Sequence, residues 1–538
     1  MFATFEPLRK RLQGRHIALV ACIAIALAVA ACFRLPGLAA RPMHADEANQ
    51  AVRAGWLWDK GEYEYDVADH HGPSLYWLTL PVLALTRATD FAHTDEWQYR
   101  LVPVAFGLGL IVLLLLVADA LGPGPTVAAA LLTAISPAMV FYSRYYIQEM
   151  LLVFFTLAAI ASGWRYFRTR SIGWAVAFGA SLGLMHATKE TWVLAAAAMA
   201  GGLAMAIVYG WCRDGAVPQF RPYLRPLALV AAAGAACAVA AAFYSSFGRN
   251  WHGPWDSVRA YVNYVHRGSE GGVHLHPWYQ YFEWLFAFRP ARGFFWTEGL
   301  IGLLALVGVL AAGRRSADPS PALHRAAFCR FLAFYTLLLT FLYAAIPYKT
   351  PWCLLSFLHG MILLAGLGAW TILARMPGRW AKAVALVLLA AGAAQLGSQA
   401  YALSFRYSAD PRNPYVYAHS SGDVLKLAAQ LERLAHASPE GHEMLVNVVT
   451  PENYWPVPWY LRRFSHVGYW QDAAEWRADA GRRPPSVILF SSEVQPDVDA
   501  AFPGAYNQQM IYGIRPGVLL SVYVRNDLWE AFLQSAGG

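Results

Sequence analysis

Residues 100–121 read RLVPVAFGLGLIVLLLLVADAL, an apolar run with one arginine and one aspartate. A helix of about 20 apolar residues crosses the hydrocarbon core of a bilayer, so this run predicts a membrane span. The chain has 538 residues, of which 57% are hydrophobic and 14% are charged. Soluble domains carry about 25% charged residues, so this chain has too few charges to cover a water-facing surface. The sequence therefore predicts a polytopic α-helical membrane protein and excludes a disordered chain.

Similar apolar runs recur along the chain and predict about 11 transmembrane helices. They lie near 16–35, 100–121, 124–142, 150–167, 172–188, 191–210, 226–245, 297–313, 328–346, 352–374 and 382–403. The first run follows a basic start, and we interpret it as an uncleaved signal anchor. The apolar stretch at 74–86 is too short to span, so we expect a helix lying on the outer membrane surface.

Basic residues gather on alternate connections between these runs and give the predicted orientation. The clusters are Arg9, Lys10, Arg11 and Arg15; Arg165, Arg168 and Arg170; Arg213, Arg221 and Arg225; Arg314, Arg315, Arg325 and Arg330; and Arg375, Arg379 and Lys382. Such clusters mark cytoplasmic segments, so the N-terminus is expected in the cytoplasm and loops 36–99 and 246–296 outside. The net charge of +8 is thus an orientation signal in a multi-pass cytoplasmic (inner) membrane protein, and no nucleic-acid partner is expected.

The composition becomes polar from about residue 405. We therefore predict a transmembrane domain at 1–404 and an extracytoplasmic α/β domain at 405–538. Within the second domain the residue pattern predicts a helix at 422–437 and strands at 443–449, 485–490 and 517–524.

Four polar clusters lie on connections that are predicted to face outward. They are His44-Ala45-Asp46-Glu47, the segment from Ser143-Arg144 to Glu149, Lys189-Glu190, and Tyr348-Lys349. Charges at membrane depth are costly and usually mark function or pairing. Cations and carboxylates on one membrane face suit a negatively charged, lipid-linked substrate.

Each cluster also has a structural interpretation, which the sequence leaves open. Asp46 could cap the helix that follows it. Arg144 and Glu149 could form an ordinary ion pair across a tight turn. Lys189 and Glu190 could form an ion pair with each other, or their side chains could extend to the membrane–water interface. The Tyr348-Lys349 segment could be an anchor at that interface.

The histidines and acidic residues also raise the question of a metal ion. His70-His71 and His274-x-His276 could hold zinc, but no third ligand has a diagnostic spacing. Oxygen ligands suit a hard divalent cation, which leaves a divalent site at Asp46, Glu47 and His44 as an open alternative.

The order of these features resembles the GT-C type membrane glycosyltransferases, in particular the superfamily of protein O-mannosyltransferases and lipid A aminoarabinose transferases (glycosyltransferase family 39). The resemblance covers about residues 10–420. It is carried by Asp46-Glu47 in a long first outer loop, the amphipathic stretch at 71–86, Trp97-Gln98-Tyr99-Arg100-Leu101-Val102-Pro103, and the Ser-Arg-Tyr segment that ends in Glu149. In that superfamily the acidic residue of the first loop is the catalytic base or an essential acid, which maps here onto Asp46.

A narrower resemblance is to a prokaryotic branch of the same superfamily, some of whose archaeal members are associated with flippase activity in N-glycosylation. It is carried by Ala187-Thr188-Lys189-Glu190-Thr191, Tyr348-Lys349-Thr350-Pro351-Trp352 and Pro414-Tyr415-Val416-Tyr417-Ala418-His419. Lys189 and Lys349 lie outside the motifs shared with the better-known enzymes, so their roles are inferred from chemistry alone.

The resemblance implies transfer of a sugar from a polyprenyl-phosphate donor to a glycan, lipid or protein acceptor at the outer face, with inversion. Asp46 is the expected base, and Glu47 its orienting or metal-binding neighbour. The expected substrate-binding residues are Arg144, Glu149, Lys189, Glu190, Tyr348 and Lys349, with Arg144 and a lysine on the phosphate and Glu149 fixing Arg144. The alternative is a flippase or exporter of lipid-linked sugars, which would place charges in mid-span.

Overall fold

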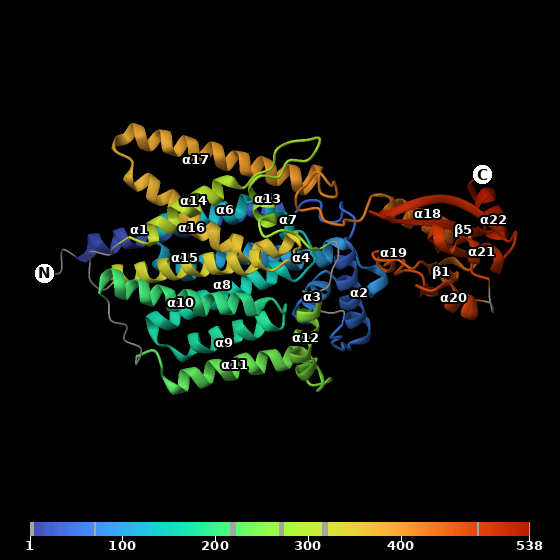
Figure 1. Cartoon of the computed structure of the whole chain (residues 1–538), viewed down its shortest axis with the longest axis horizontal. Helices are drawn as coiled ribbons and strands as arrows, with labels where there is room; N and C mark the ends of the chain where they lie inside the picture. The colour runs from blue at the N-terminus through green and yellow to red at the C-terminus, as the bar shows by residue number, and fades with distance from the viewer. Residues whose placement is uncertain are drawn as a thin grey trace. The chain divides into compact units, whose positions relative to one another are not determined.

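Helices occupy each apolar run that the sequence predicts to span the membrane (Figure 1). The computed structural model describes residues 5–68, 71–215, 222–267, 274–314, 321–480 and 484–536. The chain divides into two compact units: residues 1–38, 62–79 and 100–415 form the first, and residues 39–61, 80–99 and 416–538 form the second. This division differs from the predicted one, because two segments of the first outer loop group with the C-terminal residues.

The first unit is built from long apolar helices. They are α1 (Phe5–Arg34), α4 (Glu96–Leu113) continued by η2 (Leu114–Val117) and α5 (Ala118–Leu121), α6 (Pro123–Ile135), α7 (Pro137–Ser143), α8 (Glu149–Thr169), α9 (Ile172–His186), α10 (Trp192–Asp214), α11 (Pro226–Tyr244), α14 (Gly299–Ala312), α15 (Pro321–Ala345), α16 (Leu355–Arg375) and α17 (Gly378–Tyr401). Shorter elements connect them: α3 (Ser74–Leu85), α12 (Gly253–Arg267), α13 (Gln280–Phe286), η3 (Pro351–Leu354) and η4 (Ala402–Arg406).

Not all of these helices have the length of a complete span. Among the described residues, eight are long and apolar enough to cross a membrane, or nine if the bent pair α6 and α7 is one span. The predicted count of about 11 also includes α9 and α14, which have 15 and 14 residues. At 1.5 Å per residue each is about 20 Å long, short of a hydrocarbon core of about 30 Å. The stretch at 74–86 forms the short helix α3, as the sequence predicts.

Small residues let several of these helices pack closely. A methyl group added at Gly179 of α9 would collide with the Ala232 carbonyl of α11, and one at Gly308 of α14 would collide with the Leu364 carbonyl of α16. Without a hydrophobic driving force in lipid, such close backbone contact is a main source of helix association. In Figure 1, α9 and α11 accordingly run side by side.

The break between α6 and α7 is fixed by two buried charged groups. The helices meet at an angle of 59°. Arg34, at the end of α1, donates to the carbonyls of residues 133 and 134 at 2.8 and 2.9 Å. Glu298 accepts from Ser136 Oγ at 2.5 Å and from the Ala138 N–H at 2.7 Å. A cation thus satisfies the carboxyl end of α6 and an anion the amino end of α7, in agreement with the helix dipoles.

The second unit contains a five-stranded mixed sheet of order β2-β1-β3-β5-β4. Its elements are α2 (Ala45–Lys60), η1 (Phe91–His93), α18 (Asp423–Ala437), η5 (Gly441–Glu443), β1 (Val446–Val449), α19 (Val457–Tyr460), β2 (Val467–Trp470), α20 (Ala473–Ala480), β3 (Val487–Phe490), η6 (Ser492–Val494), α21 (Gln495–Ala501), β4 (Tyr506–Arg515), β5 (Val518–Arg525) and α22 (Asn526–Ala536). Strands β2, β1 and β3 are parallel, whereas β5 is antiparallel to β3 and β4.

The central strands are buried on both faces, which is why their sequences are almost entirely apolar. Val446, Val448, Val487 and Leu489 face a core shared with α18 and α22, whereas Ile488 and Phe490 face one shared with α20 and α21. The predicted helix and three predicted strands correspond to α18, β1, β3 and β5. Strands β2 and β4, which the sequence analysis missed, are the edges of the sheet and are more exposed, and β4 is also more polar.

Candidate functional site

The acidic segment of the first outer loop forms the start of α2 in the second unit. His44 is the N-cap, and its Nδ1 accepts from the Asp46 N–H at 3.0 Å. The Glu47 carboxylate accepts from the His44 N–H at 3.1 Å and pairs with Arg41 at 2.8 Å. Both Glu47 oxygens are used in these contacts, which include a capping box, and the Glu47 side chain is completely buried. Glu47 is therefore a structural residue of the helix start.

Asp46 has the opposite environment from its neighbour. Its side chain is 49% exposed, and Oδ2 lies 3.9 Å from His44 Nδ1. In the described part of the chain, no hydrogen bond reaches the Asp46 carboxylate. Helix residues one apart point about 100° away from each other, which explains why one acid is locked and the other open. Asp46 is thus the accessible carboxylate of the predicted pair.

The three metal candidates do not form a metal site. His44 Nδ1 accepts from a backbone N–H, and Nε2 therefore carries the proton and donates to the Tyr417 carbonyl at 2.9 Å. Burial lowers the pKa of His44, so the ring is neutral. Both ring nitrogens of His44 and both oxygens of Glu47 already have protein partners, whereas the Asp46 carboxylate accepts no hydrogen bond from the described residues. Within the described ranges, no group of three His, Cys, Asp or Glu residues could hold a metal ion.

Three of the four histidines considered for zinc lie in the described part of the chain. His70 lies outside the described residues. The His274 ring packs on Tyr348 with centroids 4.8 Å apart, and the His276 ring packs on Trp284 at 5.3 Å. Burial lowers the pKa of His276, as do His274 and Lys349 to a smaller extent. These contacts give the described histidines packing roles.

A residue that the sequence analysis missed interacts electrostatically with Asp46. Arg515, the last residue of β4, donates to the Asn453 carbonyl at 2.6 Å. Burial lowers the pKa of Arg515, and the negative charges of Asp46 and Glu452 oppose that effect. No sequence signal links Arg515 to Asp46, because the two residues are far apart in the chain and only the tertiary structure brings them within electrostatic range.

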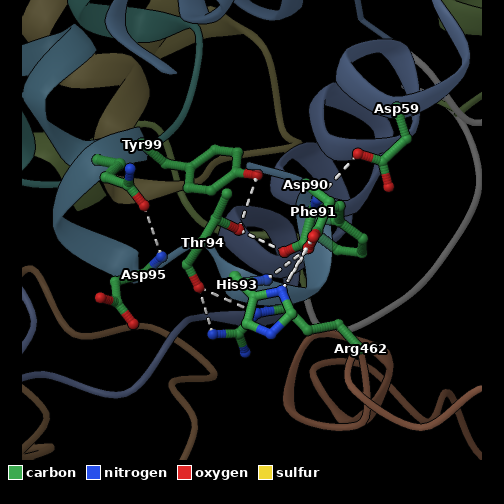
Figure 2. A network of polar contacts seen from close by, with 9 residues as sticks. Asp59, Asp90, Phe91, His93, Thr94, Asp95, Tyr99 and Arg462 are labelled. Carbon is green, nitrogen blue, oxygen red and sulfur yellow. Dashed lines mark hydrogen bonds and ion pairs between the residues drawn. The ribbon is translucent and has the colours of Figure 1, made fainter. Parts of the chain in front are cut away.

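Polar contacts attach the first-loop segments to the C-terminal part of the second unit (Figure 2). Arg462 reaches the Thr94 carbonyl through Nε at 3.2 Å and Nη2 at 2.5 Å. Asp59 of α2 accepts from the Phe91 N–H at 2.8 Å. The Met43 N–H, close to the acidic segment, donates to the Tyr460 hydroxyl at 2.9 Å. The C-terminal residues therefore hold the segment that carries Asp46.

In the first unit, Lys189 pairs with Glu149 rather than with its neighbour. Lys189 Nζ donates to Glu149 Oε1, and both side chains are buried. Burial alone would lower the pKa of Lys189, but the Glu149 carboxylate raises it above its usual value. The prediction that Glu149 fixes Arg144 is therefore wrong. A buried carboxylate needs the nearest available cation, and the start of α8 faces the turn between α9 and α10.

Glu190 points to a different part of the first outer loop. Its buried carboxylate interacts with His71 Nδ1 at 2.9 Å and with the Tyr65 hydroxyl at 3.4 Å. Burial, and then the Glu190 charge, raise the pKa of Tyr65, so this residue remains a phenol. The alternative of an internal Lys189-Glu190 pair is thus also wrong, because each residue has its own partner.

Arg144 is engaged by the backbone at the end of α1. Nη1 donates to the carbonyls of Arg34 and Pro36 at 2.8 and 2.6 Å, and Nη2 to the carbonyl of Gly37 at 3.1 Å. The guanidinium also lies 4.4 Å from the centroid of the Phe405 ring. Because these carbonyls terminate a helix, the geometry favours a structural role for Arg144 over the predicted phosphate contact.

Lys349 is a buried amine in the connection between α15 and α16. Its backbone N–H donates to the His274 carbonyl at 2.9 Å, and Tyr348 forms a β-bridge with Leu275. Nζ donates to the Ile346 carbonyl and lies 5.7 Å from the Tyr281 ring centroid. Among the described residues no carboxylate pairs with Lys349, and burial lowers its pKa. This amine would gain from an anionic ligand.

The three polar segments of the first unit adjoin one another. Tyr145, next to Arg144, stacks on Trp352 with ring centroids 6.2 Å apart. The Lys189–Glu149 pair joins two of the segments, and Cys353 lies within electrostatic range of both members of this pair. The segments that contain Arg144 and Glu149, Lys189 and Glu190, and Tyr348 and Lys349 therefore form one polar region.

With this geometry described, comparison with known proteins gives the class of protein. Residues 31–218 match the family model PMT, dolichyl-phosphate-mannose-protein mannosyltransferase. Over these residues the chain is similar to the PMT family, and its fold is of the GT-C type that the solved structures below share. No curated protein sequence matches the chain.

Two solved structures illustrate the shared fold. ArnT of Cupriavidus metallidurans, bound to undecaprenyl phosphate, is similar with a TM-score of 0.61 and 16% identity, over 95% of this chain and 98% of that one. The archaeal oligosaccharyltransferase AglB of Archaeoglobus fulgidus, in complex with an inhibitory peptide and a dolichol-phosphate, is similar with a TM-score of 0.55 and 13% identity, over 95% of this chain and 77% of that one.

Proposed function

We propose that this protein transfers a sugar from a polyprenyl-phosphate donor to an acceptor at the outer face of the cytoplasmic membrane, with inversion. The PMT match supports this class of reaction, and its residues 31–218 include Asp46, Arg144, Glu149, Lys189 and Glu190. Similarity over 95% of the chain to structures that contain undecaprenyl phosphate and a dolichol-phosphate supports the class of donor.

The exposure of Asp46 is the observation that carries the assignment of the base. It is half exposed and accepts no hydrogen bond among the described residues, whereas Glu47 is buried and doubly bonded. Asp46 takes the proton of the acceptor hydroxyl as its oxygen attacks the anomeric carbon. The new carbon–oxygen bond forms as the bond to phosphate breaks, and the phosphate leaves with the electron pair. A single displacement of this kind inverts the anomeric centre.

A phosphate leaving group is a stable anion, so cations can replace a strong general acid. Lys349 is the preferred phosphate ligand, because it is buried without a carboxylate partner in the described chain. The charge of Lys189 is balanced by that of Glu149. We propose that this pair and Glu190 hold the polar segments in place. Arg515, whose pKa is influenced by the Asp46 charge, is a second candidate for contact with the donor. No step is assigned to a metal ion, because the donor set at Asp46 does not fit one.

The experiment that tests this function measures consumption of radiolabelled polyprenyl-phosphate sugars in proteoliposomes. We expect Asp46→Asn to lower turnover about 1,000-fold, within the range that a positioned base contributes. The matched control is Asp95→Asn, since Asp95 is another exposed aspartate of the second unit (Figure 2). Equal membrane content of the variants is checked by immunoblot. Wild-type turnover by Asp46→Asn would remove Asp46 as the base, and donor movement across the bilayer without sugar transfer would contradict the proposed function.

A further inference from the structure

The first unit contains a cavity of about 490 Å³ that the proposed reaction does not use. It lies where α8 ends and where α9, α11 and α15 begin, with α10 as a further wall. Trp164, Phe167, Phe178 and Phe331 supply large apolar walls. Ligand pockets measure roughly 300–1,000 Å³, so this cavity has room for a ligand.

The helices around the cavity contribute alanines where longer side chains would close it. These are Ala159 and Ala175 of α8 and α9, Ala196 and Ala200 of α10, Ala228 and Ala232 of α11, and Ala327 of α15. The aromatic walls are held by one another, since the Trp164 ring lies 5.6 Å from Phe167 and 5.0 Å from Phe328 between centroids. The shape is therefore built into the packing, and its surface suits a hydrocarbon chain.

Arginines surround the same end of the helices. Arg168 lies 3.4 Å from His324, which lines the cavity, and Arg170 stacks on Tyr223 with its guanidinium carbon 3.9 Å from the ring centroid. Arg225 donates to the Arg170 carbonyl at 3.2 Å. Asp119 offsets part of this charge, at 3.5 Å from Arg165 and 3.9 Å from Arg168.

The arginines that Asp119 does not pair with could bind an anionic ligand. Arg170 and Arg225 form no ion pair with a carboxylate in the part of the chain that is described. The phosphate ligand Lys349 belongs to the connection after α15, whereas the arginine rim lies where α15 begins. Helix α15 has 25 residues, about 37 Å at 1.5 Å per residue, so the donor site and the rim are at opposite ends of the helices.

We propose that this cavity binds an anionic diacyl phospholipid, with one acyl chain between α8, α9, α10, α11 and α15 and the phosphate on Arg168 and Arg170. Basic pockets between helices on the cytoplasmic side recognise such headgroups, and the positive-inside rule assigns these arginines to that side. The headgroup makes the site selective, because the apolar walls alone would accept the chains of any lipid. This site is independent of the proposed sugar transfer.

Native mass spectrometry of the purified full chain tests the proposal. The detergent-solubilised protein is offered equal amounts of dioleoylphosphatidylglycerol and dioleoylphosphatidylcholine, which have identical chains. We expect the wild type to retain the anionic lipid preferentially. The double variant Arg168→Gln/Arg170→Gln should lower its affinity at least tenfold, since each arginine near an anionic headgroup contributes about fivefold. Ala200→Phe, which fills the cavity, should abolish retention.

Two matched variants serve as controls. Arg375→Gln/Arg379→Gln removes two exposed arginines on the same predicted side, near α16 and α17. Ala197→Phe adds the same ring to an exposed position of α10 that does not line the cavity. Both should bind like the wild type. Equal retention of the two lipids, or unchanged retention by the Arg168→Gln/Arg170→Gln and Ala200→Phe variants, would overturn the proposal. The proposal would also be overturned if the protein preferred undecaprenyl phosphate to phosphatidylglycerol and the Ala200→Phe variant lost that preference.

Discussion

Asp46-Glu47 in the second unit and Lys189-Glu190 in the first are both pairs of adjacent ionisable residues, yet their environments differ. In the acidic pair one member is buried in a capping box and the other is half exposed. In the second pair both members are buried, and each is held by a partner from another segment. Exposure and partners, rather than residue type, therefore distinguish a group that can react from one that holds the fold.

The same distinction applies to the two lysines of the first unit. Lys189 and Lys349 are both buried, but only Lys189 has a carboxylate partner among the described residues. A buried amine beside a carboxylate stays protonated and is electrically satisfied, whereas a buried amine on a carbonyl gains from an arriving anion. This comparison is why we propose a structural role for Lys189 and donor binding for Lys349.

The largest expected effect separates the two acids of α2. Glu47→Gln should lower the free energy of unfolding by about 1.5–3 kcal/mol, because Arg41 loses a charged partner, and should leave turnover of the folded protein within a few-fold. Asp46→Asn should do the reverse, with about 1,000-fold lower turnover and an unchanged melting temperature. Tryptophan-fluorescence melting and the donor-consumption assay measure the two effects. Loss of turnover at full stability in Glu47→Gln would make Glu47 a reactive group as well.

A further effect, on stability, is expected at the buried ion pair. Lys189→Met should lower the free energy of unfolding by about 3–5 kcal/mol, because it leaves the Glu149 charge buried and unpaired. The double variant Lys189→Met/Glu149→Leu should recover most of that stability. Thermal unfolding in detergent checks both variants. A double variant as unstable as the single one would show that the pair does not act as a unit, and a stable double variant with lost donor affinity would return Lys189 to the phosphate site.

The smallest effect concerns pH. Burial lowers the pKa of Lys349, so its cation is present at low pH and is lost as pH rises through that lowered pKa. Donor affinity should therefore fall on the alkaline side at a lower pH than an exposed lysine would give. Lys349→Arg should shift the fall in donor affinity to higher pH, since arginine stays protonated. Affinity titrations across the alkaline range measure the shift, and identical profiles for wild type and Lys349→Arg would argue against Lys349 as the ligand.

Much of the helical fold could be predicted because lipid imposes a strong and local constraint. An apolar run is recognisable without its neighbours, and helices formed at every predicted run. Helices α9 and α14 are short because polar residues bound their apolar runs: Thr188-Lys189 follow α9, and Glu298 precedes and Arg314 follows α14. Strands β2 and β4 were missed for different reasons: β2 has only four residues, one of them Gly468, and β4 carries polar residues that interrupt the apolar pattern.

The site was predictable only as a set of segments. Charge near span ends indicated the four clusters, but nothing local showed that Glu149 pairs with Lys189, that Arg144 caps α1, or that Arg515 interacts electrostatically with Asp46. Each of these contacts joins residues far apart in the chain. Pairing depends on distance in space, which a sequence pattern with helical or strand period does not contain.

The sequence by itself determined that this chain enters a membrane as many helices, that a polar α/β segment follows them, and which charged segments stand at the helix ends. It did so because the free energy of moving side chains between water and lipid depends on composition and run length alone. The tertiary structure decided which of those charges are satisfied and which remain available. That outcome depends on burial and on partners brought together by packing, because a buried charge is stable only beside a counter-charge or a set of hydrogen-bonding groups.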